Sequence, residues 1–383
     1  MLARCLTAIT LAAALAVAFA AAGTAAHSDA PQAAPEAKQA KPEKPWPPDA
    51  ATLEKRRLEA EALPLFASLE PIEITLTADF KTVQRDRDVN SKKTYPGTVT
   101  VTTGGIGGQP IPIQLRTRGH VRRNARLCEF APLRLEFQKD AVKGTLFKGQ
   151  GALKLGTHCQ SEGVYRQYTL KEYLASRLLN VLTPRSLRVR LATVTYADSD
   201  AGKRPFTMPG ILYEDADDMA KRTEARENAV QRLMFGALDQ PTLLFMSLFQ
   251  YMIGNTDYSI LTLHNVIILK DTKGAYHPVP YDFDYSGLVS AHYAVVAKEL
   301  GLSSVQERKY RGPCKTEAEI DQALQPFREK KDALLAVPGT LPGLDEGHRR
   351  NAEKYLNAFF ETIARPDKVK TIFVTECRSM PGM

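Results

Sequence analysis

The chain has 383 residues, of which 44% are hydrophobic and 25% are charged, and its formal net charge is +8 at pH 7. This composition is ordinary for a globular protein, and no segment after the N-terminal region is long and apolar enough to cross a bilayer. The positive charge is spread along the chain without a nucleic-acid-binding motif, so we expect no nucleic acid as partner.

The first 26 residues predict a cleavable secretory signal peptide. Arg4 supplies a positive charge, residues 6–22 are apolar or small, and residues 22–26 offer small side chains to a signal peptidase. A retained membrane anchor is the alternative, but the apolar run is shorter than the roughly 20 residues that a spanning helix needs. We therefore expect an exported protein, periplasmic or secreted, with no transmembrane segment after signal cleavage.

Residues 27–50 predict a disordered linker, because prolines are interspersed with Ala, Lys, Glu and Gln and the segment has no helical or strand period. Once Cys5 is removed with the signal, Cys128, Cys159, Cys314 and Cys377 remain. An even number of cysteines in an oxidising compartment predicts two disulfides. Sequence alone allows three pairings, of which Cys128–Cys159 with Cys314–Cys377 is the most local.

Strand patterns dominate the region 51–214, which we interpret as a sheet-rich N-lobe. A charged helix is expected near 52–66 and a helix with period 3.6 over 165–182. Strands are expected over 72–76, 98–102, 111–115, 133–137, 152–155, 187–196 and 206–214.

The region 215–383 predicts a helical C-lobe. A strongly apolar segment over 243–253 indicates a buried helix, and a β-hairpin is expected from strands over 266–269 and 276–281. Further helices are expected over 317–335 and 345–363. Together the two regions predict a bilobal α+β protein.

Polar side chains cluster around the predicted hairpin. Asp257 and Asn265 precede its first strand, and Asp282 and Asp284 follow its second strand, so all should lie at the same end of the hairpin. Mg²⁺ takes oxygen ligands, usually one or two carboxylates together with substrate phosphates. A further aspartate can deprotonate an acceptor hydroxyl. This combination is what phosphoryl transfer requires.

The segment 253–287 resembles the catalytic core of the spore-coat protein H (CotH) kinase-like family and, more distantly, of HipA-type atypical kinases. The resemblance extends upstream to Arg-Thr-Arg-Gly-His at 116–120 and to Pro-Gly-Ile-Leu-Tyr-Glu at 209–214. It covers roughly residues 72–287. It implies a bilobal protein-kinase-like fold, with an antiparallel-sheet N-lobe containing one main helix and a helical C-lobe.

The resemblance also implies roles around the metal. Asp257 would be the catalytic aspartate that meets the acceptor hydroxyl. Asn265 and Asp282 would bind Mg²⁺ or Mn²⁺, and Asp284 would share that metal or hold its water.

The phosphate donor implied by the resemblance is ATP. Lys154 would contact its phosphates and be held by Glu172, while Arg118 and Gly119 would approach the phosphates and Glu214 would lie near the nucleoside. Other cations that compete for the role of Lys154 are Lys143, Lys148 and Arg134.

Three features depart from the family pattern, the first being that Tyr258 follows Asp257 where many relatives have Arg or His. Asp257 and Asn265 are eight residues apart, whereas kinase loops place them about five apart. The triplet at 282–284 is Asp-Phe-Asp, with the next glycine at Gly287. Any of these departures is compatible with a protein that has lost catalysis.

Some nearby polar residues have simpler interpretations. The cluster Arg122, Arg123 and Arg126 predicts a solvated basic face, with contact to an acidic substrate as the alternative. His264 is interpreted as a loop histidine that satisfies backbone groups.

These patterns predict an exported, Mg²⁺- and ATP-dependent phosphotransferase acting on a protein or an anionic cell-envelope polymer. The alternatives are a non-catalytic, kinase-like envelope binding protein and a metal-dependent hydrolase using Asp257, His264 and Asp282.

Overall fold

The computed structural model of the chain describes residues 45–200, 202–228 and 232–377. The segment from Trp46 onward forms one compact unit. The predicted signal peptide and residues 27–44 of the predicted linker lie outside the described residues. Within the described part, no helix has the length and apolar character needed to cross a membrane.

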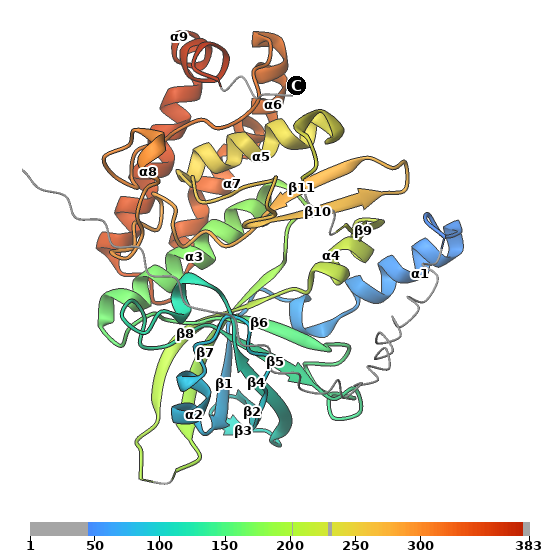
Figure 1. Cartoon of the computed structure of the whole chain (residues 1–383), viewed down its shortest axis with the longest axis vertical. Helices are drawn as coiled ribbons and strands as arrows, with labels where there is room; N and C mark the ends of the chain where they lie inside the picture. Colours follow the sequence, from blue (N-terminus) through green and yellow to red (C-terminus); the bar gives the residue numbers. More distant parts are fainter. Residues whose placement is uncertain (1–44, 201, 229–231, 378–383) are drawn as a thin grey trace, which may run out of the picture. The chain divides into compact units, whose positions relative to one another are not determined.

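Seven strands close into a barrel (Figure 1). Around the barrel they follow one another as β1 (Ile72–Ala78), β7 (Val189–Asp198), β8 (Phe206–Tyr213), β6 (Ala152–Gly156), β5 (Leu133–Phe137), β4 (Ile111–Thr117) and β2 (Tyr95–Thr103). The barrel closes because β1 pairs with both β2 and β7. The β1–β7 pair is parallel, whereas the other pairs are antiparallel, and β3 (Ile106–Gly107) extends beside β2.

Alternating side chains fill the barrel. Every second residue of β1 and β4 is buried, including Ile74, Leu76 and Leu115. Burying each such side chain contributes roughly 1.5–3 kcal/mol. A Cβ built on Gly97 would lie 2.6 Å from the carbonyl oxygen of Thr77, so β1 and β2 approach too closely there for any larger residue.

The prediction of a bilobal protein-kinase-like fold, with an antiparallel-sheet N-lobe and a helical C-lobe, is wrong. The sheet is a closed barrel and contains a parallel strand pair. Alternation of apolar residues shows that a segment is a strand but not which strand it pairs with, and β1 and β7 are more than 100 residues apart in the chain.

The remaining elements pack beside the barrel. The long helix α3 (Gly163–Leu182) contacts β7 and β8, and its apolar face shares a core with the C-terminal helices. A second sheet has the strand order β11 (Tyr276–Pro280), β10 (Val266–Asp271), β9 (Ala225–Glu227). The other helices are α1 (Ala50–Glu61), α2 (Phe80–Arg85), α4 (Ala216–Arg222), α5 (Gln240–Ile253), α6 (Glu317–Glu329), α7 (Lys331–Ala336), α8 (Glu346–Ile363) and α9 (Pro366–Val369).

Helix α5 sets the position of the polar loop that follows it. Asp239 caps its start by accepting a hydrogen bond from the backbone N–H of Thr242. Gly254 ends it in a left-handed conformation (φ 65°), which glycine adopts without steric cost. The chain then turns out of the core toward the β10–β11 hairpin.

Both predicted disulfides form, Cys128–Cys159 and Cys314–Cys377. The pairing expected from sequence locality is therefore confirmed. Disulfides, together with the lack of a membrane-spanning helix in the described part, are compatible with an exported protein.

Candidate functional site

A cavity of about 280 Å³ lies between the segment after β4 and the loops that flank the β10–β11 hairpin. The predicted site residues that line it are Arg118, Gly119, Glu172, Asp257, Asn265, Asp282 and Asp284. The cavity therefore contains every site residue expected from the sequence except Lys154 and Glu214.

Asp257 and Asn265 meet in spite of their unusual spacing. The Nδ2 of Asn265 donates hydrogen bonds to the backbone carbonyl oxygen (2.8 Å) and the Oδ2 (3.1 Å) of Asp257. Ser259 and His264 exchange two backbone hydrogen bonds, which close off the extra residues between them as a small loop. The insertion therefore protrudes from the site and does not separate the two residues.

His264 also turns toward the site. Its Nε2 lies 3.0 Å from the Oδ1 of Asp257. The side chains of both residues are partly exposed, at 50% for His264 and 37% for Asp257. The interpretation of His264 as a residue that satisfies loop backbone is wrong for its imidazole, which orients the carboxylate of Asp257 toward the cavity.

Arg311 stabilises the loop that carries Asp257. The sequence alone does not identify this residue. Its guanidinium donates hydrogen bonds to the carbonyl oxygens of Thr256 and Tyr258, the two residues that flank Asp257. It also lies over the ring of Tyr258, 4.9 Å from the centroid. A single arginine 54 positions after the aspartate carries no recognisable spacing signal.

Asp282 follows β11 and has a left-handed backbone (φ 64°). Such a conformation in a residue other than glycine costs on the order of 1–3 kcal/mol and is concentrated at functional sites. Among the described residues, the carboxylate of Asp282 has no hydrogen bond or ion pair. Its oxygens are therefore available to a ligand in the cavity.

Glu172 and Asp284 are buried in the wall of the cavity. The hydroxyl of Tyr213 donates a 2.5 Å hydrogen bond to Glu172, and that of Tyr293 donates a 3.1 Å hydrogen bond to Asp284. Burial, followed by the charge of Asp282, raises the pKa of Glu172 to about 7 and raises the pKa of Asp284 well above its usual range.

The raised pKa of Glu172 predicts a pH-dependent stability. The protonated carboxyl is favoured in the folded state, so its contribution is complete below pH 4.5, the ordinary pKa, and is lost as the pH rises through about 7. A Glu172→Gln variant carries no such charge. We expect its stability relative to wild type to increase by about 3 kcal/mol between pH 4.5 and 8. Thermal unfolding of both proteins across this range tests this, and a constant difference would contradict it.

Lys154 lies on β6 beside the cavity but does not pair with Glu172. Its Nζ is 4.9 Å from the centroid of the Tyr281 ring, and Tyr281 lines the cavity. Burial, together with the charge of Arg118, lowers the pKa of Lys154 to about 8. Across the described residues, neither Lys154 nor Arg118 has an anionic side chain within ion-pair distance. The cation beside Glu172 is Arg122, at 3.8 Å.

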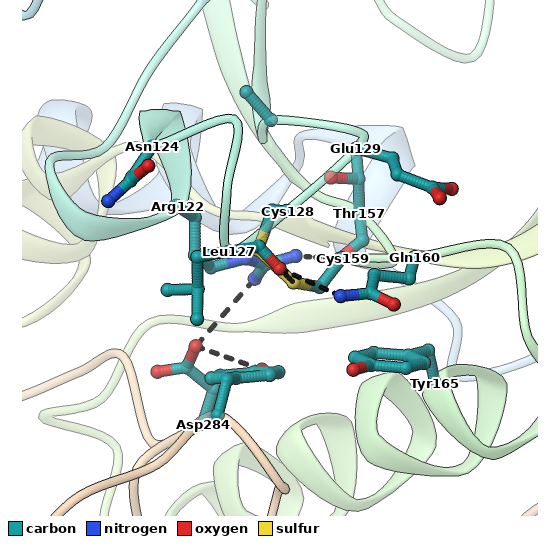
Figure 2. The surroundings of a disulfide bond; sticks show 12 residues. Arg122, Asn124, Leu127, Cys128, Glu129, Thr157, Cys159, Gln160, Tyr165 and Asp284 are labelled. Atoms are coloured by element: carbon teal, nitrogen blue, oxygen red, sulfur yellow. Dashed lines mark hydrogen bonds and ion pairs between the residues drawn. A yellow bond between two sulfur atoms is a disulfide. The ribbon is translucent and has the colours of Figure 1, made fainter.

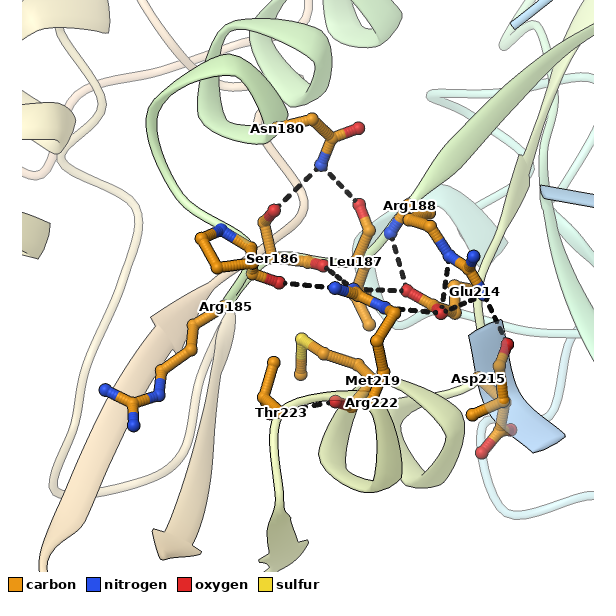
Figure 3. A network of polar contacts seen from close by, with 12 residues as sticks. Asn180, Arg185, Ser186, Leu187, Arg188, Glu214, Asp215, Met219, Arg222 and Thr223 are labelled. Atoms are coloured by element: carbon orange, nitrogen blue, oxygen red, sulfur yellow. Dashed lines mark hydrogen bonds and ion pairs between the residues drawn. The ribbon is translucent and has the colours of Figure 1, made fainter. Parts of the chain in front are cut away.

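Glu214 lies elsewhere, in a structural network at the end of β8 (Figure 3). Its buried carboxylate accepts hydrogen bonds from the side chains of Arg188 and Arg222 and from the backbone N–H of Arg188. With both oxygens engaged, it joins the end of β8 to α4 and does not line the cavity.

The prediction of a solvated basic face at 122–126 is wrong for two of its three arginines. Arg122 and Arg123 are buried, with exposed fractions of 8% and 4%, and only Arg126 is exposed. The guanidinium of Arg123 donates hydrogen bonds to the carbonyl oxygens of Asp88 and Thr117.

Among its described residues, the cavity offers only a few protein ligands to a hard cation. No group of three or more His, Cys, Asp or Glu side chains within the described ranges is arranged as a metal site. Asp282 and the amide oxygen of Asn265 form a smaller oxygen-rich set, which suits Mg²⁺ or Mn²⁺ that completes its shell with water and phosphate oxygens.

Comparison with known proteins gives no family assignment. No protein-family model matches the chain, and no curated protein matches it. Among solved structures, the chain is similar to the crystal structure of a Helicobacter pylori proinflammatory kinase, CtkA, with 11% sequence identity and a TM-score of 0.33, over 74% of this chain and 95% of that chain. With so low a TM-score, the function is inferred from the geometry of the site itself.

Proposed function

We propose that this protein is a divalent-cation- and nucleotide-dependent phosphotransferase. The observation that carries the proposal is the arrangement of unpaired charges in the cavity and, at Lys154, beside it. Asp282 has an unpaired carboxylate beside the Asp257–Asn265 pair, and Arg118 and Lys154 are two cations with no ionic partner among the described residues. A ligand made of a metal ion and phosphates requires both kinds of charge: a free carboxylate to bind the metal and free cations to contact the phosphates.

Each residue has a task that its contacts allow. Asp282 binds the cation, helped by the Oδ1 of Asn265, whose Nδ2 is already committed to Asp257. Arg118 and Lys154 offset phosphate charge. Gly119 (φ 84°) turns the chain beside the cavity, where its backbone N–H is not used by any described residue.

Asp257 is the base of the proposed reaction. Its Oδ1 is oriented by His264 and its Oδ2 by Asn265, which leaves further lone pairs for an acceptor hydroxyl. The bound metal and nucleotide would supply charge neutralisation and the phosphoryl group. As the acceptor oxygen bonds to the terminal phosphorus, the bond to the nucleoside diphosphate breaks and the hydroxyl proton passes to Asp257.

We further propose that the nucleotide is ATP, that the acceptor is a protein or an anionic cell-envelope polymer, and that the protein is exported and related to the CotH family. The two disulfides support an oxidising compartment. Nucleotide would have to be available there, so assays on intact cells should include added ATP.

A thermal-shift titration of the purified protein tests the proposal. Mn²⁺ with ATP should raise the melting temperature of wild type by several degrees, and Asp282→Asn should remove most of this shift because the cation loses its one unpaired carboxylate. Absence of any shift in wild type would overturn the proposal. A shift without transfer of labelled phosphate to protein or envelope fractions would favour the non-catalytic binding protein instead.

A further inference from the structure

Arg122 lies between two of the carboxylates that line the cavity. Its Nη1 is 3.8 Å from the Oε2 of Glu172 and 3.8 Å from the Oδ2 of Asp284 (Figure 2 shows the Asp284 side). Its Nη2 donates a hydrogen bond to the carbonyl oxygen of Thr157. Burial opposes its charge, but the neighbouring acidic groups, including Tyr293, Asp284 and Glu172, raise the pKa of Arg122 above its usual value.

The carboxylates of the cavity therefore fall into two pairs. Glu172 and Asp284 each face Arg122, and each accepts a hydrogen bond from a tyrosine hydroxyl. Asp282 and Asp257 do not contact Arg122 within ion-pair distance, and Asp282 has no partner among the residues described. A cation entering the cavity would meet in Asp282 a carboxylate with no hydrogen bond to displace among the residues described.

From this geometry we propose that Arg122 is a positioning residue: it holds Glu172 and Asp284 together in the wall of the cavity and leaves Asp282 as the carboxylate that binds the cation. The inference rests on the proposed phosphotransfer site and changes two of its assignments. Asp284 becomes a partner of Arg122 and not a metal ligand, and Arg122 takes the place beside Glu172 that the sequence suggested for Lys154.

The physical reason is the concentration of negative charge. Glu172, Asp282 and Asp284 lie close enough for their charges to act on one another. Without a guanidinium between them, the two buried carboxylates would repel Asp282 and each other more strongly and would be expected to move apart. A planar guanidinium can contact both at once, which an ammonium group does less well.

The Cys128–Cys159 disulfide lies close to Arg122 and restrains the segment that carries it (Figure 2). Arg122 lies six residues before Cys128, and its hydrogen-bond acceptor Thr157 lies two residues before Cys159. The backbone N–H of Phe130 donates to the carbonyl oxygen of Cys159 at 3.1 Å. The disulfide therefore links the segment that carries Arg122 to the segment that carries its hydrogen-bond acceptor, Thr157.

The test compares Arg122→Met and Arg122→Lys with Arg123→Met. Arg123 is the matched control, because it is an adjacent, equally buried arginine whose hydrogen bonds go to backbone carbonyls. Titration of each full-length mature protein with Mn²⁺ and ATP should show that Arg122→Met weakens binding by about 10–100-fold, the range found for residues that orient metal ligands. Arg122→Lys should recover part of the affinity, and Arg123→Met should stay within about twofold of wild type.

A second measurement needs no ligand. Melting temperatures of Arg122→Met, Glu172→Gln and the double variant at pH 8 form a double-mutant cycle. If Arg122 holds Glu172, Glu172→Gln should raise the melting temperature more in the Arg122→Met background than in wild type, because only there does it remove an uncompensated buried charge. Additive effects in the cycle, or equal loss of Mn²⁺ affinity in Arg122→Met and Arg123→Met, would overturn the inference. If wild type binds no Mn²⁺ with ATP, the proposed function fails, while the cycle still decides the role of Arg122.

Discussion

Asp257→Asn is expected to lower phosphate transfer by about 10²–10⁴-fold, the contribution usual for a positioned general base. Asparagine keeps the size of the side chain: its oxygen can accept from the Nδ2 of Asn265, and its amide N–H can donate to the Nε2 of His264 in the tautomer that leaves this nitrogen unprotonated, so the loop should persist. Binding of Mn²⁺ with ATP should therefore change by less than about threefold. Initial rates with labelled ATP, measured beside binding isotherms, separate the two effects.

The outcome that would contradict this prediction is transfer at the wild-type rate. It would mean that the acceptor proton leaves by another route and that Asp257 serves only to hold Asn265. His264→Gln is the matched comparison, since it removes the imidazole that orients Asp257 but leaves the base. A smaller loss, of about tenfold, is expected.

Removing the Cys128–Cys159 bond in a Cys128→Ser, Cys159→Ser variant is expected to lower both the stability of the protein and its affinity for Mn²⁺ with ATP. The bond spans 31 residues and Cys314–Cys377 spans 63, so on chain-entropy grounds each contributes about 4 kcal/mol. The two losses of stability should thus be similar. Only the first variant should also lose affinity for Mn²⁺ with ATP, because only that bond holds the segment of Arg122.

Urea unfolding of both double-cysteine variants measures their losses of stability. Titration with Mn²⁺ and ATP, at a temperature where both variants are still folded, measures their affinities. Equal loss of affinity in the two variants would contradict this prediction and would show that binding follows overall stability. The Cys314→Ser, Cys377→Ser variant should instead slow transfer, since Cys314 lies three residues after Arg311, which holds the Asp257 loop.

Local features of the fold could be predicted from the sequence, but its closure could not. The strand expected over 133–137 is β5, and the helix expected over 165–182 is α3 with two more residues at its start. Both follow from side-chain periodicity, which is a local property. The parallel pairing of β1 with β7 depends on contacts between distant segments, and it is this pairing that turns the expected open sheet into a barrel.

In the site, too, local features could be predicted from the sequence and long-range contacts could not. Asp257, Asn265 and Asp282 were found because they flank strands that form one hairpin, and the structure brings them to one cavity. For Arg122 the sequence predicts a solvated position, because the residue stands in a cluster of arginines and such clusters are usually solvated. Its burial depends on Glu172 from α3 and Asp284 from the loop after β11, which no local pattern reveals.

The most direct test of the account is the position of the cation. Crystals of the mature wild-type protein grown with Mn²⁺ and a non-hydrolysable ATP analogue would locate the metal by its anomalous scattering. The account predicts one or two Mn²⁺ ions bonded to Asp282, with Asn265 or phosphate oxygens completing the shell and Arg122 still between Glu172 and Asp284. Mn²⁺ bonded to Glu172 and Asp284, or nucleotide bound outside this cavity, would contradict it.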